Sequence, residues 1–133
     1  MNIMTILALR TDNPTAELYV YSNGQQIAAR QWHGHRQLGE TLHTTIKEVL
    51  AQAGLQTSHI QGVVAYQGPG SFTGLRIGLT VANALAYSNG CPVVAEQGQD
   101  WVATGIDRLQ SGHDDGAALP HYDSPVFTTR PRK

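Results

Sequence analysis

The sequence predicts a single α/β lobe built on a five-stranded mixed sheet with flanking helices. Short apolar runs rich in β-branched residues alternate with longer segments whose apolar residues recur at helical spacing. A glycine-rich turn within residues 68–78 joins one apolar run to a helical segment. The chain has 133 residues, which is enough for one domain with its own core. Together these three observations favour the α/β class.

The first part of the chain predicts three consecutive strands. Residues 3–9 are nearly all apolar, as expected of a strand that is covered on both faces. Residues 17–21 form the second predicted strand and residues 26–32 the third. Asn23 and Gly24 lie between them and predict a two-residue hairpin loop, because both central positions of that loop require positive φ.

The middle of the chain alternates helices with strands. Apolar residues recur at helical spacing over residues 38–53, which predicts the first helix. Residues 60–66 predict the fourth strand, and residues 73–87 the second helix. A short fifth strand at residues 92–95 and a third helix at residues 99–109 complete the predicted lobe.

The predicted domain organisation is one N-terminal lobe, residues 1–110, followed by a tail, residues 111–133. Residues 111–118 are rich in Gly, Asp and Ser, which is typical of a linker. Residues 119–133 contain three prolines and no periodicity, so they are expected to be extended or disordered.

The composition excludes several classes of protein. The formal net charge is −1, so no global positive field attracts nucleic acid. A single cysteine, Cys91, excludes an internal disulfide and is typical of a reducing cytoplasm, where we expect the protein to act. The N-terminus lacks the pattern of a signal peptide, and no run of 18 apolar residues predicts a membrane span.

The glycine-rich turn is the most informative motif. It consists of Gly68, Pro69, Gly70, Ser71, Phe72, Thr73 and Gly74, with Arg76 in the helix that follows. Glycines allow a sharp reversal, and Ser71 or Thr73 could accept a hydrogen bond from the first helical turn. The N–H groups of such a turn suit an anion. The turn lacks the Lys-Ser/Thr ending of a P-loop and has GxGxxxG spacing rather than that of the dinucleotide fingerprint.

The string GPGSFTGLRIG closely resembles the motif of the TsaB (YeaZ) family, and the resemblance extends over residues 3–103. Members of that family are non-catalytic subunits of the bacterial complex that makes threonylcarbamoyladenosine in tRNA. The resemblance implies an actin-like or ribonuclease-H-like lobe. Three sequential strands, with the first one central, also resemble the start of such a lobe. Family members carry a second lobe that this sequence lacks, and residues 118–125 look like the family's closing segment. We therefore expect a short form that arose by natural or engineered deletion.

The second predicted helix has one narrow polar stripe, formed by Arg76, Thr80 and Asn83. The remaining circumference is apolar or small, which is more than packing on a sheet requires. Two explanations are open: the surplus contacts a partner, or the first helix covers it. In the TsaB relatives that this sequence resembles, the first two helices pack together and form the interface with the partner. The side chains predicted for that interface are Leu42, Thr45, Ile46, Val49, Leu75, Leu79, Ala82 and Ala86.

The partners follow from the same resemblance. They are a TsaD-like catalytic subunit, a TsaE-like ATPase reached through the complex, and tRNA reached only through the complex. The chain alone is expected to form a homodimer, because an uncovered apolar helix face tends to pair with another copy. No cofactor and no membrane contact are expected.

Other candidate chemistry is weaker. Family members usually end the first strand in Asp-Thr, whereas this chain has Arg10 and Thr11, and an arginine would repel a metal. We therefore expect Arg10 to be a surface residue at a strand end. Six histidines, among them His33, His35 and His43, are expected to be scattered on the surface rather than to hold zinc, which needs three or four ligands. Ser71 has no recognisable His and Asp partners, and Cys91 is expected to be a packed thiol.

Three functions compete at this point. The first is the non-catalytic TsaB-like subunit. The second is a small actin-like ATP-dependent phosphotransferase or hydrolase that uses the glycine turn, and the third is a glycoprotease-like enzyme. In the actin-like class nucleotide lies between two lobes, whereas this chain predicts only one, so neither hydrolysis nor tight binding of ATP is expected. For the third function, the sequence has no recognisable set of ligands for the metal of a protease.

Overall fold

The structure is a computed structural model that describes residues 4–34, 38–70 and 72–121. The elements in chain order are β1 (Thr5–Arg10), β2 (Thr15–Ser22), β3 (Gln25–His33), α1 (Leu38–Gln52), the 3₁₀ turn η2 (Thr57–His59), β4 (Gly62–Tyr66), α2 (Phe72–Asn89), β5 (Val93–Glu96) and α3 (Trp101–Gln110). The five strands form one sheet in the order β3-β2-β1-β4-β5. β1 is antiparallel to β2 and parallel to β4, which confirms the predicted mixed sheet.

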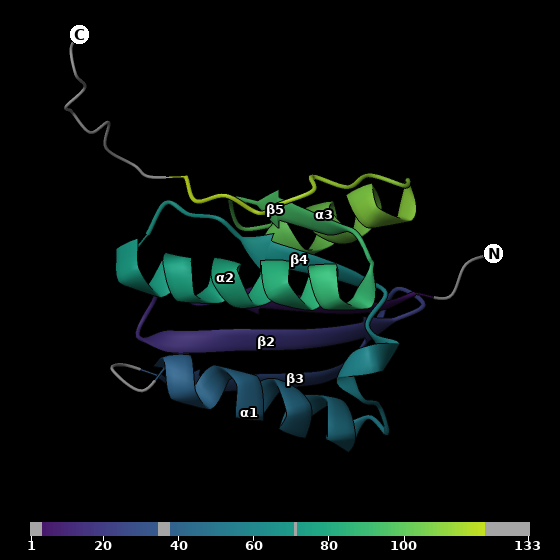
Figure 1. Cartoon of the computed structure of the whole chain (residues 1–133), viewed down its shortest axis with the longest axis horizontal. Helices are drawn as coiled ribbons and strands as arrows, with labels where there is room; N and C mark the ends of the chain where they lie inside the picture. Colours follow the sequence, from purple (N-terminus) through teal and green to yellow (C-terminus); the bar gives the residue numbers. More distant parts are fainter. Residues whose placement is uncertain (1–3, 35–37, 71, 122–133) are drawn as a thin grey trace, which may run out of the picture.

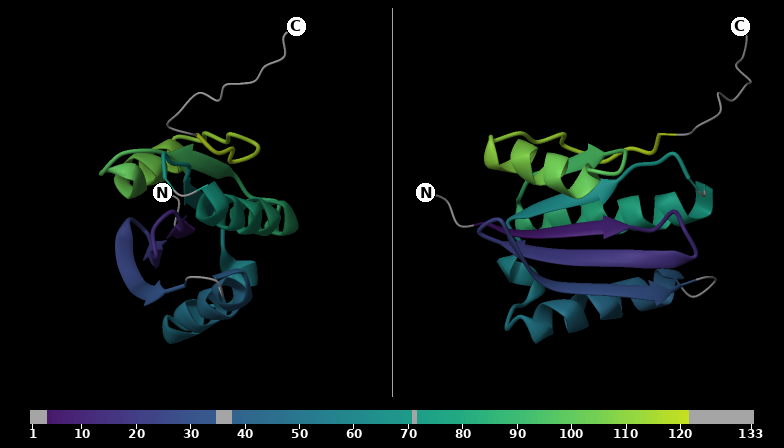
Figure 2. Two further views of the ribbon diagram at one scale, coloured as in Figure 1. Left: turned by 90° about the vertical axis from the view of Figure 1, so that its left-hand side faces the viewer. Right: turned by 180° about the vertical axis from the view of Figure 1, so that it is seen from behind.

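The sheet separates two layers of helices. α1 and α2 lie on one face, and α3 lies on the other (Figures 1 and 2). β1 is therefore covered on both sides, and Ile6, Leu7 and Ala8 are completely buried. This burial confirms the prediction made from the continuous apolar run. None of the helices in these residues is long and apolar enough to cross a membrane.

The β2–β3 hairpin has the loop that its sequence predicts. Asn23 has φ 54° and Gly24 has φ 80°, so both central residues occupy the left-handed region. The two strands then pair from Ser22 and Gln25 to Thr15 and His33.

The glycine turn connects β4 to α2, as predicted. Gly68 has φ 112°, which is unfavourable for any residue with a Cβ. Gly70 and Gly74 serve a different purpose, because a Cβ on either would collide with the loop between β1 and β2. Thr11, in that loop, donates a hydrogen bond from Oγ1 to the Gly74 carbonyl over 2.6 Å. The glycines thus allow the first loop of the sheet to lie against the start of α2.

Residues 111–121, which we call the strap, contain no helix or strand but are held against β5 by hydrogen bonds. The Asp114 and Asp115 carboxylates accept hydrogen bonds from the N–H groups of Val93 and Ala95, over 3.2 and 2.9 Å. The Asp115 N–H donates to the Val93 carbonyl over 2.8 Å. β5 is an edge strand, and the two carboxylates bond to backbone groups that a neighbouring strand would otherwise pair with. These bonds explain why a Gly- and Asp-rich segment is held in place. Residues 122–133, the rest of the predicted tail, lie outside the described part.

A second group of contacts holds the strap to α2 and α3. Asn83 donates to the Ala118 carbonyl over 3.0 Å and accepts from its N–H over 2.7 Å. Ala118 is 1% exposed. Arg108 forms ion pairs with Asp115, over 2.6 Å, and with Glu96. Burial by itself would raise the pKa of Asp115, but the hydrogen bonds from Arg108 and the Ala95 N–H, together with the nearby positive charge, outweigh burial and lower that pKa below its ordinary value.

Candidate functional site

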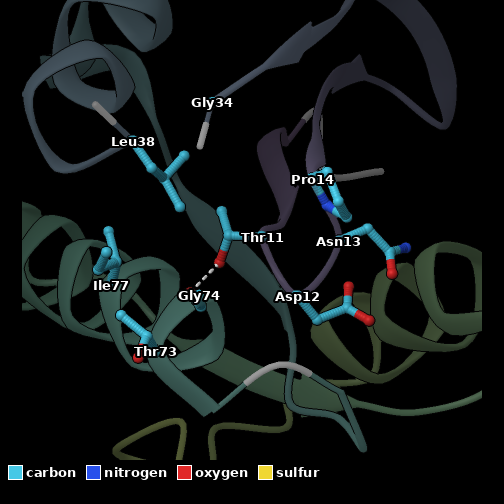
Figure 3. A pocket seen from close by; sticks show the side chains of 9 residues that line it. All are labelled: Thr11, Asp12, Asn13, Pro14, Gly34, Leu38, Thr73, Gly74 and Ile77. Carbon is cyan, nitrogen blue, oxygen red and sulfur yellow. Dashed lines mark hydrogen bonds between the residues drawn. The ribbon is translucent and has the colours of Figure 1, made fainter. Parts of the chain in front are cut away.

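A cavity of about 250 Å³ lies beside the glycine turn, between the β1–β2 loop, the start of α1 and the first turns of α2 (Figure 3). Its lining residues are Thr11, Asp12, Asn13, Pro14, Gly34, Leu38, Thr73, Gly74 and Ile77. In Figure 3 the side chains of Thr11, Leu38 and Ile77 face one another, whereas the Asp12 carboxylate points away from them. The middle of the cavity is therefore mostly apolar. Ser71 lies outside the described residues.

The charge beside this cavity is already neutralised. Asp12 accepts two hydrogen bonds from the Arg10 guanidinium, from Nε over 2.6 Å and from Nη2 over 3.2 Å. The guanidinium carbon also lies 3.8 Å from the centre of the Tyr66 ring. Burial alone would lower the pKa of Arg10, but its hydrogen bond to Asp12 and the Asp12 charge outweigh burial and raise it.

These contacts correct the expectation for Arg10. It is not a free surface residue but the counter-ion of Asp12, whose side chain is only 3% exposed. The position of Asp12 also changes the interpretation of the turn. A Cβ on Gly70 would lie 2.5 Å from Asp12 Oδ2, so a carboxylate already packs against the turn that precedes α2. The Asp12 side chain therefore occupies space beside the turn that a bound anion would need.

The predicted interface residues do not form a surface. Leu42, Ile46, Val49, Leu75 and Ala82 are 0% exposed, Leu79 and Ala86 are 4% exposed, and Thr45 is 7% exposed. All eight belong to the lobe's own interior, since α1 and α2 contact each other and the same face of the sheet. The prediction that these side chains face a partner is therefore wrong. The alternative explanation, in which the first helix covers the surplus, fits their burial.

A shallow groove lies on the outer side of the same two helices. It has a volume of about 430 Å³ and is lined by Gly39, Thr73, Arg76, Ile77, Thr80 and Val81. Ile77 and Val81 are half-buried, and they are flanked by the exposed Arg76 and Thr80. We call it the helix groove. Sequence reasoning missed Ile77 and Val81, although each directly follows a residue of the polar stripe that marks the outer face.

The remaining candidates do not converge on a reactive site. His33 and His43 are exposed on different elements, and His35 lies outside the described residues. Within residues 4–34, 38–70 and 72–121, no three His, Cys, Asp or Glu side chains are grouped so that they could hold a metal ion. Cys91 is half-buried, and burial, followed by the charge of Asp114, raises the pKa of its thiol. A raised pKa leaves less thiolate for nucleophilic chemistry.

Comparison with known proteins places the lobe in a family. A family model described as "TsaD: tRNA N6-adenosine threonylcarbamoyltransferase" matches residues 32–108, more than half of the chain. The tRNA threonylcarbamoyladenosine biosynthesis protein TsaB of Haemophilus influenzae is 30% identical over 96% of this chain and 53% of its own length. The solved structure of YeaZ from Pseudomonas aeruginosa superimposes with a TM-score of 0.67, at 27% identity. The chain belongs to the TsaB (YeaZ) family. The YeaZ match covers 81% of this chain and 50% of that one.

The chain thus spans about half the length of the TsaB and YeaZ proteins that it matches. The fold itself is more widely distributed. RuvC of Thermus thermophilus has the same ribonuclease-H-like architecture, with a TM-score of 0.50 at 15% identity over 88% of this chain. At that identity the likeness shows the fold alone. It confirms the predicted fold class for a TsaB-family lobe.

Proposed function

We propose that this chain is a non-catalytic subunit of a tRNA threonylcarbamoyladenosine-forming complex. In that role it binds a TsaD-like catalytic subunit through the outer sides of α1 and α2. The observation that carries the proposal is the helix groove, an apolar floor of Ile77 and Val81 on the solvent side of a TsaB-family lobe. A TsaE-like ATPase and tRNA would be reached only through the assembled complex.

The helix groove has the properties of an anchor point for another helix. Gly39 has no side chain and faces open space, so a partner backbone can approach closely at that end. Arg76 and Thr80 provide a polar rim around the apolar floor, an arrangement common in protein interfaces. A stable interface buries roughly 800 Å² on each partner, so α1 must contribute beside the groove. Without the partner, two copies are expected to pair through the same face.

A catalytic role receives less support from the geometry. The acidic residue nearest the glycine turn is Asp12, and both of its oxygens are bonded to Arg10. Holding a magnesium–nucleotide complex there would require displacing that guanidinium. The actin-like phosphotransferase remains the competing proposal, and the glycoprotease-like enzyme has no specific observation in its favour.

Calorimetric titration of the purified chain with a TsaD-like protein tests the proposal. Val81→Asp places a charge in the floor of the groove, where desolvation is expected to cost roughly 3 kcal/mol or more. Against a micromolar affinity, about −8 kcal/mol, this should weaken binding at least tenfold. Ala103→Asp is the matched control, because it adds the same charge at an exposed position on α3, across the sheet. Circular dichroism must show that both variants are folded.

The outcomes separate the candidate functions. Loss of binding in Val81→Asp alone supports the groove as the interface. If both variants bind like the parent protein, the groove is not the interface. If the parent protein does not bind any TsaD-like subunit but binds magnesium–ATP with micromolar affinity, the phosphotransferase takes its place.

A further inference from the structure

A third hollow lies on the opposite face of the sheet, between β2 and the start of α3. Its volume is about 450 Å³, and its lining includes Arg10, Glu17, Tyr19, Tyr21, Gln99 and Trp101. We call it the aromatic trough. α3 covers only the β4–β5 side of this face, which leaves β2 and β3 open beside it (Figure 2, right). The proposed function above does not use this surface.

The trough combines aromatic rings with a carboxylate. Tyr19 lies against Trp101, with ring centroids 6.3 Å apart. The Tyr19 hydroxyl donates a hydrogen bond to Glu17 Oε1 over 2.6 Å, and it accepts one from Gln31 over 3.2 Å. This network holds the Glu17 carboxylate beside the rings.

The carboxylate of Glu17 has no direct ion pair among the described residues, although the charge of Arg10 acts on it from across the ladder. The Arg10 guanidinium is bonded to Asp12 instead. The charges of Arg10, Asp12 and Glu17 therefore sum to −1. Trp101 is buried, so the accessible rings are those of the half-buried Tyr19 and Tyr21. Aromatic rings beside a carboxylate attract guanidinium and ammonium groups.

We propose that the aromatic trough binds a guanidinium or ammonium group, and that the C-terminal residues 122–133 of the same chain supply it. Three of the last four residues of the chain are Arg130, Arg132 and Lys133. They form its only concentrated positive charge, and their sign is opposite to that of the trough.

The end of the strap makes this contact possible. The His121 N–H donates to the Gln67 carbonyl over 2.7 Å, at the end of β4. The Gln67 side chain accepts a hydrogen bond from Gln97 over 3.3 Å, and Gln97 lies two residues before Gln99 of the trough. The nine residues from 122 to 130 span at most about 30 Å when extended, which is sufficient for this short path along one end of the sheet.

Tethering also makes a weak contact effective. A group tethered to its site by a short stretch of chain acts at an effective concentration on the order of millimolar. A trough with a millimolar dissociation constant would then be about half occupied. Occupancy should fall with salt, since a partly exposed charge pair is screened at high ionic strength.

The test compares the amide and indole NMR signals of the full chain with those of the variant Arg130→Gln/Arg132→Gln/Lys133→Gln. Removing the tail charges should shift the signals of Glu17, Tyr19 and Trp101, and 1 M NaCl should produce the same shift in the parent chain. Lys47→Gln is the matched control, because it removes an exposed positive charge from α1 on the other face. It should leave the trough signals unchanged.

Two further measurements identify the ligand and its source. A synthetic peptide of residues 122–133, added to the tail variant, should restore the parent shifts in a saturable manner, and Glu17→Gln should abolish that response. Trough signals that do not change when the tail charges are removed overturn the proposal. If the peptide has no effect but arginine methyl ester shifts the trough signals, the tail is ruled out as the source of the cation.

Discussion

The Arg10–Asp12 pair offers a quantitative test of the electrostatics beside the glycine turn. The Asp12 side chain is 3% exposed and that of Arg10 is 22% exposed. Replacing Arg10 with Ala leaves a buried carboxylate without its counter-ion. Removing one partner of a buried pair costs about 3–5 kcal/mol. Because Arg10 is partly exposed and water could reach Asp12 in the variant, we expect the lower end, about 3 kcal/mol.

Urea unfolding measures this loss directly. With a denaturant slope of about 2 kcal/mol per molar, the midpoint of Arg10→Ala should fall by about 1.5 M. Arg30→Ala is the matched control, since the Arg30–Glu48 pair has side chains 30% and 56% exposed. Such a surface pair contributes less than about 1 kcal/mol.

A double-mutant cycle separates the orphaned charge from lost packing. Adding Asp12→Asn to Arg10→Ala removes the charge, so part of the lost stability should return. If Arg10→Ala costs no more than Arg30→Ala, Asp12 does not depend on the guanidinium, and our explanation of the site's charge is wrong. If Asp12→Asn makes the variant still less stable, the loss comes from packing of Arg10 on Tyr66 rather than from the charge.

Three further predictions concern stability. Ala82→Arg should abolish the cooperative thermal transition because Ala82 is completely buried, whereas Ala84→Arg, at an exposed position on the same helix, should keep it; equal melting curves would contradict the burial. Gly74→Ala should lower the free energy of unfolding because its Cβ would collide with the β1–β2 loop, while Gly39→Ala, which meets only open space, should raise it by up to about 1 kcal/mol in urea titrations. The folded-state pKa of Asp115 lies below 3.8, so its contribution to stability is complete above that pH and is lost as the pH falls through the folded value. In Asp115→Asn the decline in unfolding free energy at acid pH should therefore be smaller. An unchanged decline would count against the strap contacts.

The sequence was sufficient for the features that depend on local chemistry. The β2–β3 loop followed from two residues that tolerate positive φ, Asn23 and Gly24. The central position of β1 followed from an apolar run that leaves neither face for water. The β4–α2 turn followed from its glycines, although only the structure shows that Gly74 makes room for another loop rather than for a ligand.

The orientation of α2 could not be predicted from its own residues. A helix that is apolar over most of its circumference can present any of several sides to the sheet. The positions of both α1 and the sheet determine that Leu75 and Ala82 are buried while Ile77 and Val81 remain half-exposed. Arg10 was missed for a related reason, because its partner Asp12 depends on how the loop after β1 folds back.

The hydrogen bonds between the strap and β5 could not be predicted from composition. The segment is rich in Gly, Asp and Ser, and such segments are usually solvated linkers. Here the carboxylates of Asp114 and Asp115 bond to the backbone N–H groups of the terminal strand. That role depends on where the chain passes after α3, which no local pattern records.

The contacts of the strap with β5 affect how copies of this lobe behave at high concentration. An open strand edge is a template on which a further strand can add, and repeated addition leads to aggregates. On β5 the outward N–H groups of Val93 and Ala95 already bond to side-chain carboxylates, and the Val93 carbonyl already accepts from Asp115. An incoming strand would have to displace three hydrogen bonds and strip water from two negative charges before forming its first ladder contact. The residues that follow α3 thus protect the β5 edge of the sheet from strand addition without forming a strand themselves.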